Sequence, residues 1–203
     1  MSSLPSKTLV FIAVMSALGN VLSALSITIS PIIPSIPLGP ISVSLALDLS
    51  HVTTFIAALF GGPIIGGLTG MIGGMVAAYR FGFSNGNLVT GFGLPIGKAL
   101  TGVAAGYIMR RVRVFERQKA ALILSTISSY IPEGVFTIFI FIMVFPVFFP
   151  TTPLSFLIPF TIQIIVKAFF EMIVMGLILA AMIENQGFTG YVKGFFAKPE
   201  GHF

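Results

Sequence analysis

Long apolar runs fill almost the whole of this chain, and several of them are long enough to cross a lipid bilayer. A membrane-spanning helix needs about 20 predominantly apolar residues. Only 8% of the 203 residues are Asp, Glu, Lys or Arg, whereas soluble domains have about 25%. Because so few charges cannot cover a water-exposed surface, the sequence predicts an integral membrane protein.

The apolar runs predict six transmembrane helices in a single all-α domain that covers residues 1–203. The predicted spans are about 8–29, 43–60, 63–81, 89–109, 120–144 and 157–183. Two uncharged, proline-rich connectors lie between them, "SPIIPSIPLGP" at 30–40 and "FPVFFPTTP" at 145–153. In the first connector a proline stands at every third residue, which favours an extended, polyproline-like strap.

Lysine and arginine are distributed unevenly between the two sides of the predicted bundle. With six spans, four segments share one side of the bundle. They are the N-terminus, the turn between spans two and three, the loop between spans four and five, and the C-terminal tail. The cations of that side are Lys7, Arg110, Arg111, Arg113, Arg117, Lys119, Lys193 and Lys198. The loops of the other side contain only Arg80. Since cytoplasmic loops carry the excess of Lys and Arg, both termini are predicted to be cytoplasmic.

A stripe of glycines runs along the third predicted span. Gly62, Gly66, Gly70 and Gly74 recur every fourth residue, so they lie on one face of a helix. Small residues at this spacing let a neighbouring backbone approach closely in a membrane. The stripe indicates either packing between helices of this chain or a deformable, ligand-facing helix, and the two interpretations are compatible.

Span one has a second pattern of small residues. Ala13 and Ala17 are four residues apart, and Gly19 and Ser23 follow on a neighbouring strip. Such a face serves either internal packing or docking of a separate protein. The spacing alone leaves both interpretations open.

Polar groups within or beside the apolar spans are the candidate substrate-binding residues, because an ionisable side chain in a bilayer is costly and usually functional. The candidates are Asp48, His51, Asn85, Asn87, Lys98, Glu133, Gln163, Lys167 and Glu171. Several lie toward the outer half of the predicted bundle. This placement predicts a pocket that opens outward rather than a pore lined from end to end.

The spacing of the charged candidates suggests partners for some of them. Lys167 and Glu171 are four residues apart, so they either pair with each other or present Lys167 to a ligand. Lys98 needs a carboxylate, a carbonyl or water at membrane depth. Glu133 is a plausible partner for Lys98 on sequence grounds.

Motifs of enzymes and cofactor sites are absent from the sequence. There is no cysteine and no HExxH, and His51 and His202 are too far apart in sequence to suggest a local metal site. The stretch "FSNGN" at 83–87 is interpreted as a turn. No glycine-rich phosphate loop precedes a lysine, so ATP hydrolysis would require partner chains. We therefore expect no catalytic residues, no metal and no cofactor. Most cations flank spans, so no nucleic-acid partner is predicted.

Three features resemble the substrate-binding (S) components of energy-coupling factor (ECF) transporters, which take up vitamins and related micronutrients in prokaryotes. The first is the size, with six spans and cytoplasmic termini. The second is "FIAVMSALGNVLSAL" at 11–25, whose Ala13 and Ala17 are similar to the AxxxA motif of the family's first helix. The third is "LDLSHVTTFIAALFGGPIIGGLTGMIGG" at 47–74, which is similar to the second and third helices.

The resemblance implies a mechanism and a set of partners. An S component of this kind binds its substrate from outside the cell, and the connectors at 30–42 and 80–88 would cap the pocket. It would dock through Ala13 and Ala17 on a transmembrane coupling subunit that works with two ATPase subunits. ATP hydrolysis would then topple the S component in the prokaryotic plasma membrane and release the substrate inside.

For the substrate, the resemblance favours riboflavin as the best guess. "LDLSHV" resembles a Leu-Asp-Phe-Ser stretch of riboflavin-specific members, and Gln163 with Lys167 resembles a polar residue four positions before a lysine. The lysine usual in their third helix is absent here, where only Arg80 is found. The alternative function is a solitary or oligomeric carrier or channel that works without an ATPase partner, assembled through the glycine stripe.

Overall fold

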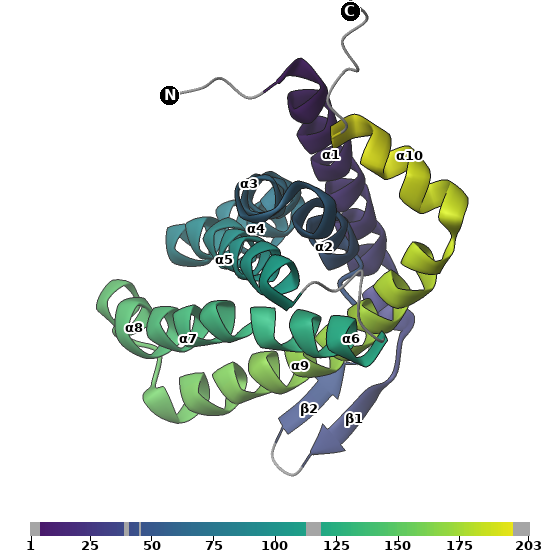
Figure 1. Cartoon of the computed structure of the whole chain (residues 1–203). Coiled ribbons are helices and arrows are strands. Elements are labelled where there is room, and N and C mark those ends of the chain that lie inside the picture. Colours follow the sequence, from purple (N-terminus) through teal and green to yellow (C-terminus); the bar gives the residue numbers. More distant parts are fainter. Residues whose placement is uncertain (1–4, 39–40, 45, 113–118, 197–203) are drawn as a thin grey trace, which may run out of the picture.

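The structure, a computed structural model, describes residues 5–38, 41–44, 46–112 and 119–196. It is a bundle of helices with one small β-hairpin at its edge (Figure 1). The elements are α1 (Ser6–Ile29), the 3-10 turn η1 (Ser30–Ile32), β1 (Ser35–Leu38), β2 (Ile41–Ser44), α2 (Ser50–Gly61), α3 (Pro63–Gly73), α4 (Met75–Phe81), the 3-10 turn η2 (Phe83–Asn85), α5 (Leu88–Val112), α6 (Lys119–Ser129), α7 (Ile131–Phe139), the π-helical turn η4 (Ile140–Val144), α8 (Phe145–Phe148), α9 (Leu154–Glu184) and α10 (Gln186–Phe196).

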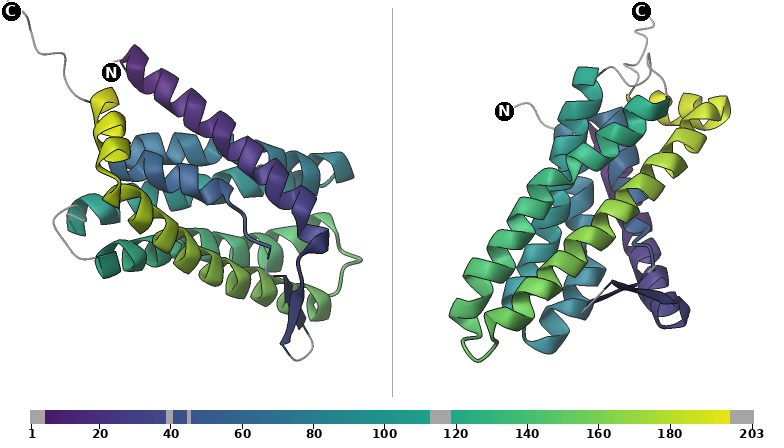
Figure 2. Two further views of the ribbon diagram at one scale, coloured as in Figure 1. Left: turned by 90° about the vertical axis from the view of Figure 1, so that its right-hand side faces the viewer. Right: turned by 90° about the horizontal axis from the view of Figure 1, so that it is seen from below.

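The helices form two groups that pack face to face (Figure 2). One group contains α1 to α5, in which α1 lies across α2 and α3. The other contains α6 and α7, which run alongside α9. The amphipathic helix α10 returns to the beginning of α1, where Phe195 and Phe196 contact Phe11 at ring-centroid distances of 5.5 and 5.0 Å. The beginning of α1 and the last described helix therefore lie at the same end of the bundle.

Five helical segments of the described chain are long and apolar enough to cross a membrane. They are Ser6–Ile32, Pro63–Asn85, Leu88–Val112, Lys119–Phe148 and Leu154–Glu184. These agree within a few residues with five of the predicted spans. The remaining predicted span, at 43–60, is represented by the short apolar helix α2, so six crossings and the cytoplasmic position of the termini stay predictions.

The prediction of a continuous span over 43–60 was wrong at its beginning. Residues 41–44 form β2, and α2 extends only over the 12 residues Ser50–Gly61. At about 1.5 Å per residue, such a helix is shorter than the hydrocarbon core of about 30 Å. The sequence "ISVS" alternates apolar and polar residues with the period of a strand, which explains the difference.

The prediction of a polyproline-like strap at 30–42 was also wrong. The segment forms η1 and then an antiparallel hairpin in which Ser35 pairs with Ser44 and Leu38 with Ile41. Pro37 is tolerated in β1 because a strand of a two-stranded sheet has a free edge, where a missing N–H breaks no ladder.

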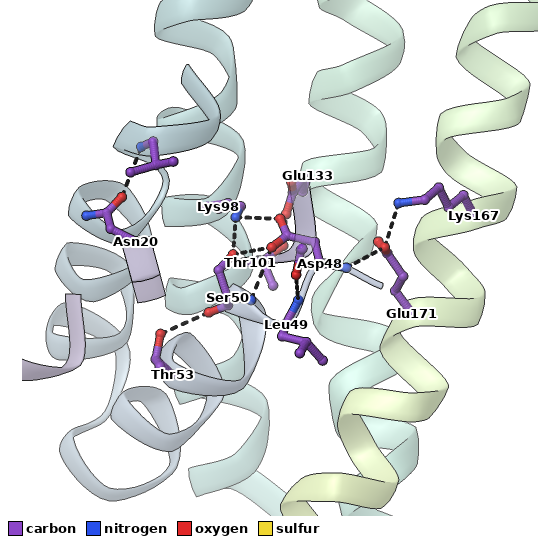
Figure 3. Close-up of polar contacts among 12 residues, drawn as sticks. Asn20, Asp48, Leu49, Ser50, Thr53, Lys98, Thr101, Glu133, Lys167 and Glu171 are labelled. Carbon is purple, nitrogen blue, oxygen red and sulfur yellow. Dashed lines mark hydrogen bonds and ion pairs between the residues drawn. The ribbon is translucent and has the colours of Figure 1, made fainter. Parts of the chain in front are cut away.

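The third predicted span consists of two helices, α3 and α4, with a break at Gly74. The side chain of Asn20 on α1 fills this break. Its Nδ2 donates to the carbonyl of Ile72 at 2.9 Å. Its Oδ1 accepts from the amide of Val76 at 2.9 Å, and Figure 3 draws this second bond from the Asn20 side chain. Ile72 and Val76 would bond to each other in an unbroken helix, so the side chain is inserted into the backbone ladder.

The glycine stripe packs α3 against α5. A Cβ atom on Gly66 would lie 2.6 Å from the carbonyl oxygen of Gly102, and one on Gly70 would lie 2.5 Å from that of Lys98. Gly62, at φ 85°, forms the turn between α2 and α3, and Pro63 begins α3. The packing interpretation of the stripe is therefore the one that the structure supports.

Candidate functional site

A cavity of about 570 Å³ lies between α5, α7, η4 and α9, next to the segment that precedes α2. This volume falls within the range of small-molecule sites, about 300–1,000 Å³. The charged, imidazole and amide side chains of its wall are Asp48, His51, Asn87, Lys98, Glu133, Lys167 and Glu171. A second cavity of about 510 Å³ lies between α1 and α4. Among the described residues, its ionisable side chains are Tyr79 and Arg80. Because charged and polar side chains converge in the cavity between α5, α7, η4 and α9, that cavity is the candidate site.

Lys98 and Asp48 form an ion pair on one side of this cavity. Lys98 Nζ lies 2.7 Å from Asp48 Oδ2 and also donates to the hydroxyl of Ser50 (Figure 3). Ser50 in turn donates to Asp48 Oδ1 through its amide at 3.1 Å and its hydroxyl at 2.6 Å. Since only 4% of the Lys98 side chain is exposed, its charge depends on these partners. The suggested Lys98–Glu133 pairing was therefore wrong.

Lys167 and Glu171 form the second ion pair, within α9. Lys167 Nζ lies 2.7 Å from Glu171 Oε1, which matches the intrahelical interpretation of their spacing. The same oxygen accepts a 2.8 Å hydrogen bond from the backbone amide of Asp48. The two ion pairs are thus joined through residue 48, which connects α9 to the segment before α2.

Glu133 lies in the first turn of α7, across the cavity from α9. It accepts a hydrogen bond from the hydroxyl of Thr101 on α5. Gly97 leaves room for it, since a Cβ there would lie 3.2 Å from Glu133 Oε1. The position near a helix N-terminus stabilises a carboxylate. Within the part of the chain that the structure describes, Glu133 has no lysine or arginine in ion-pair distance.

His51 and Asn87 also line the cavity. His51 is 5% exposed, its ring lies 6.2 Å from that of Phe55, and its buried Nδ1 has no hydrogen-bond partner among the described residues. The Oδ1 of Asn87 accepts from the amide of Thr90, so this side chain also caps α5.

Two candidates from the sequence lie elsewhere. Asn85 is exposed on η2, where its Nδ2 donates to the carbonyl of Arg80 at 3.2 Å. Gln163 is half-buried on α9 and is not part of the cavity wall. The face of α9 that lines the cavity passes through Ile164, Lys167 and Glu171 instead.

An aromatic wall forms the rest of the cavity, and sequence reasoning did not identify its phenylalanines. They are Phe81, Tyr130, Phe141, Phe145, Phe156 and Phe160. Phe141 lies edge-on to Phe160 at 5.3 Å, and Phe156 is stacked on Phe160 at 5.8 Å. With 21 phenylalanines in an apolar chain, composition could not separate these from lipid-facing rings. Ser50 and Thr101, which hold Lys98 and Glu133, were missed as well.

Ala13 and Ala17 are both exposed on α1, on the side away from the core of the bundle. Apolar neighbours surround them, and Val14 and Leu18 are 56% and 43% exposed. The face is therefore small and apolar, and no described element of this chain covers it.

The sequence profile of the family "ECF transporter, substrate-specific component" matches residues 7–183. This chain belongs to that family. Its members bind the substrate of a transporter and are not enzymes, and this S component is a multi-pass protein of the prokaryotic plasma membrane.

One solved structure similar to this S component is "the S-component for biotin from an ECF-type ABC transporter". The match has a TM-score of 0.52 and 20% sequence identity, and it covers 94% of this chain and 100% of that one. At this identity the likeness shows the fold alone. No curated protein matches the sequence.

Proposed function

We propose that this S component binds a vitamin-like micronutrient in the cavity between α5, α7 and α9. The observation that carries the proposal is the convergence of two ion pairs, Glu133 and an aromatic wall on one cavity of about 570 Å³. A few polar groups that fix orientation, set in apolar walls, are the usual composition of a small-molecule site.

The proposed roles follow from the contacts. Lys98 with Asp48, and Lys167 with Glu171, form a rigid polar floor whose free lone pairs and N–H groups contact the substrate. Glu133 and His51 provide hydrogen-bonding groups that the described residues leave only partly paired or unpaired. Asn87 contributes from the beginning of α5, while Asn85 and Gln163 have no direct role in this proposal.

Riboflavin and biotin are the first vitamins to test. Riboflavin is the best guess from the "LDLSHV" stretch, which contributes Asp48 and His51 to the cavity. The similar solved structure is that of an S-component for biotin. Both have a ring system with N–H groups, which suits a cavity with aromatic and carboxylate walls.

The proposed transport step uses a transmembrane coupling subunit and two ATPase subunits, with Ala13 and Ala17 as the docking face. The exposure of both alanines supports this proposal. The alternative of an oligomeric carrier depended on the glycine stripe. Since Gly66 and Gly70 are packed against α5, the stripe is not free to join a second copy.

The experiment is mass spectrometry and an absorbance scan of ligand bound to the detergent-solubilised protein after incubation with riboflavin and biotin. One vitamin bound per chain, and displaced from a Lys167→Met variant, would support the cavity as the site. Stoichiometric binding that the Lys167→Met variant leaves unchanged would contradict it.

A further inference from the structure

The charges of the cavity are unequal. Three carboxylates and two lysines line it, and each lysine is already paired at 2.7 Å, Lys98 with Asp48 and Lys167 with Glu171. Glu133 is the carboxylate that the described residues leave without a cation. Its one hydrogen bond among them is the one that Thr101 donates to Oε2.

An anionic substrate group would meet lysines whose positive charge is already offset by a carboxylate at 2.7 Å. If it drew a lysine away, the carboxylate left behind would be buried without compensation, which is unfavourable. Lys98 is least available, since its side chain is 4% exposed and its ammonium is shared between Asp48 and Ser50. Both ion pairs therefore select against a negative charge on the buried part of the substrate.

Glu133 has the opposite preference. It is 9% exposed, and a carboxylate with one hydrogen bond retains most of its acceptor capacity. A second observation points to a missing ligand group, because His51 lines the same cavity and its buried Nδ1 has no hydrogen-bond partner among the described residues. The site thus offers unfilled hydrogen-bonding capacity at two buried positions.

We propose that Glu133 determines the class of substrate by binding a hydrogen-donating, positively charged or N–H-rich end of it. The substrate is a planar nitrogen heterocycle with a protonated amine or an N–H edge against Glu133, and it has no anionic group at that end. The inference rests on the proposed function, in that it takes this cavity as the substrate site.

The aromatic wall supports the planar part of the proposal. Phe141 and Phe160, at 5.3 Å from each other, present rings to the cavity from η4 and α9. Aromatic faces favour a flat ring, and their negative potential also favours a nearby cation. The preference of the aromatic wall for a flat ring and the preference of Glu133 for a cation therefore indicate the same class of substrate.

Three probes of nearly equal size separate the charge preference from the shape of the cavity. Benzylamine, benzyl alcohol and benzoate share one ring and differ in charge, and at about pH 8 benzylamine is cationic and benzoate anionic. With about eight non-hydrogen atoms, such probes reach roughly millimolar affinity. Binding is measured by calorimetry against a detergent-only blank, in the wild type, in Glu133→Gln and in the control Glu184→Gln, whose carboxylate pairs with Lys119 outside the cavity.

The expected result is that the wild type and Glu184→Gln bind benzylamine at least about tenfold more tightly than benzyl alcohol, with benzoate weakest. Glu133→Gln should bind benzyl alcohol as the wild type does, which reports an intact fold, and should lose the preference for benzylamine. Equal or tighter binding of benzoate by the wild type would overturn the inference. So would a preference that Glu133→Gln retains, or the absence of binding by all three probes.

The proposed function has a separate readout. A preference for benzylamine that depends on Glu133, in a protein that binds no micronutrient and supports no uptake, would leave the charge inference standing and overturn the function. Stoichiometric binding of a substrate that is anionic at its buried end would do the reverse.

Discussion

Lys98 and Asp48, 50 positions apart in the sequence, form a 2.7 Å ion pair that joins α5 to the segment before α2. The backbone amide of Asp48 also donates to Glu171 on α9. Residue 48 therefore connects the two helical groups of the bundle at the wall of the cavity. The same contacts that shape the candidate site also hold these groups together.

The first prediction concerns the stability of this pair. Asp48→Asn leaves the Lys98 ammonium buried without its carboxylate, which should lower the free energy of unfolding by about 3 kcal/mol. The double variant Asp48→Asn/Lys98→Met removes both charges and should recover much of that loss. Thermal unfolding in detergent measures both. A double variant no more stable than the single one would show that the ion pair is not the cause.

The second prediction concerns Asn20 and the break between α3 and α4. Asn20→Leu removes two hydrogen bonds, each with a net contribution of about 1 kcal/mol, and leaves the amide of Val76 without its acceptor. Hydrogen exchange at Val76 should therefore become faster. Thr28→Val is the matched control, since Thr28 lies on the same helix and its hydroxyl donates to the carbonyl of Ala24 within that helix. Unchanged exchange at Val76 would contradict the role given to Asn20.

The third prediction concerns the glycine stripe. Gly66→Ala would place a methyl group 2.6 Å from the carbonyl of Gly102 and should destabilise the fold by about 1–3 kcal/mol as α3 and α5 separate. Gly190→Ala, on α10 with nothing within 4 Å, should instead be neutral or slightly stabilising. The comparison of melting temperatures tests the packing, and equal effects at both positions would refute it.

The fourth prediction concerns docking. Ala17→Phe should leave substrate binding intact and abolish uptake, because a bulky side chain prevents close approach of a partner helix. Leu124→Phe is the control, since Leu124 is 62% exposed on α6, away from α1. Uptake by Ala17→Phe at the rate of the control would exclude this face as the docking site.

Composition and apolar run length were sufficient to predict a helical membrane protein, because both report directly on the solvent that surrounds the chain. The length of the apolar runs also predicted the five long spans. The hairpin was missed because proline spacing was given more weight than the alternation in "ISVS". The break at Gly74 depends on Asn20, more than 50 positions away, and no local pattern contains that contact.

In the candidate site, too, some contacts could be predicted from the sequence and others could not. The pair of Lys167 and Glu171 could be expected because both residues lie on one helix at a spacing of four. The partner of Lys98 could not, since Asp48 and Glu133 are both distant in sequence and only the packing of α2 against α5 distinguishes them. The aromatic wall depends on which phenylalanines face inward, and the π-helical turn η4 alters that pattern around Phe141.

The most direct test of the account is uptake by proteoliposomes that contain this S component, with and without a coupling subunit and its ATPases. A mixture of vitamins is offered outside, and mass spectrometry identifies what accumulates inside. The account predicts accumulation of one micronutrient that requires both ATP and the partner subunits and is lost in Ala17→Phe. Accumulation by the S component alone, without ATP, would contradict it.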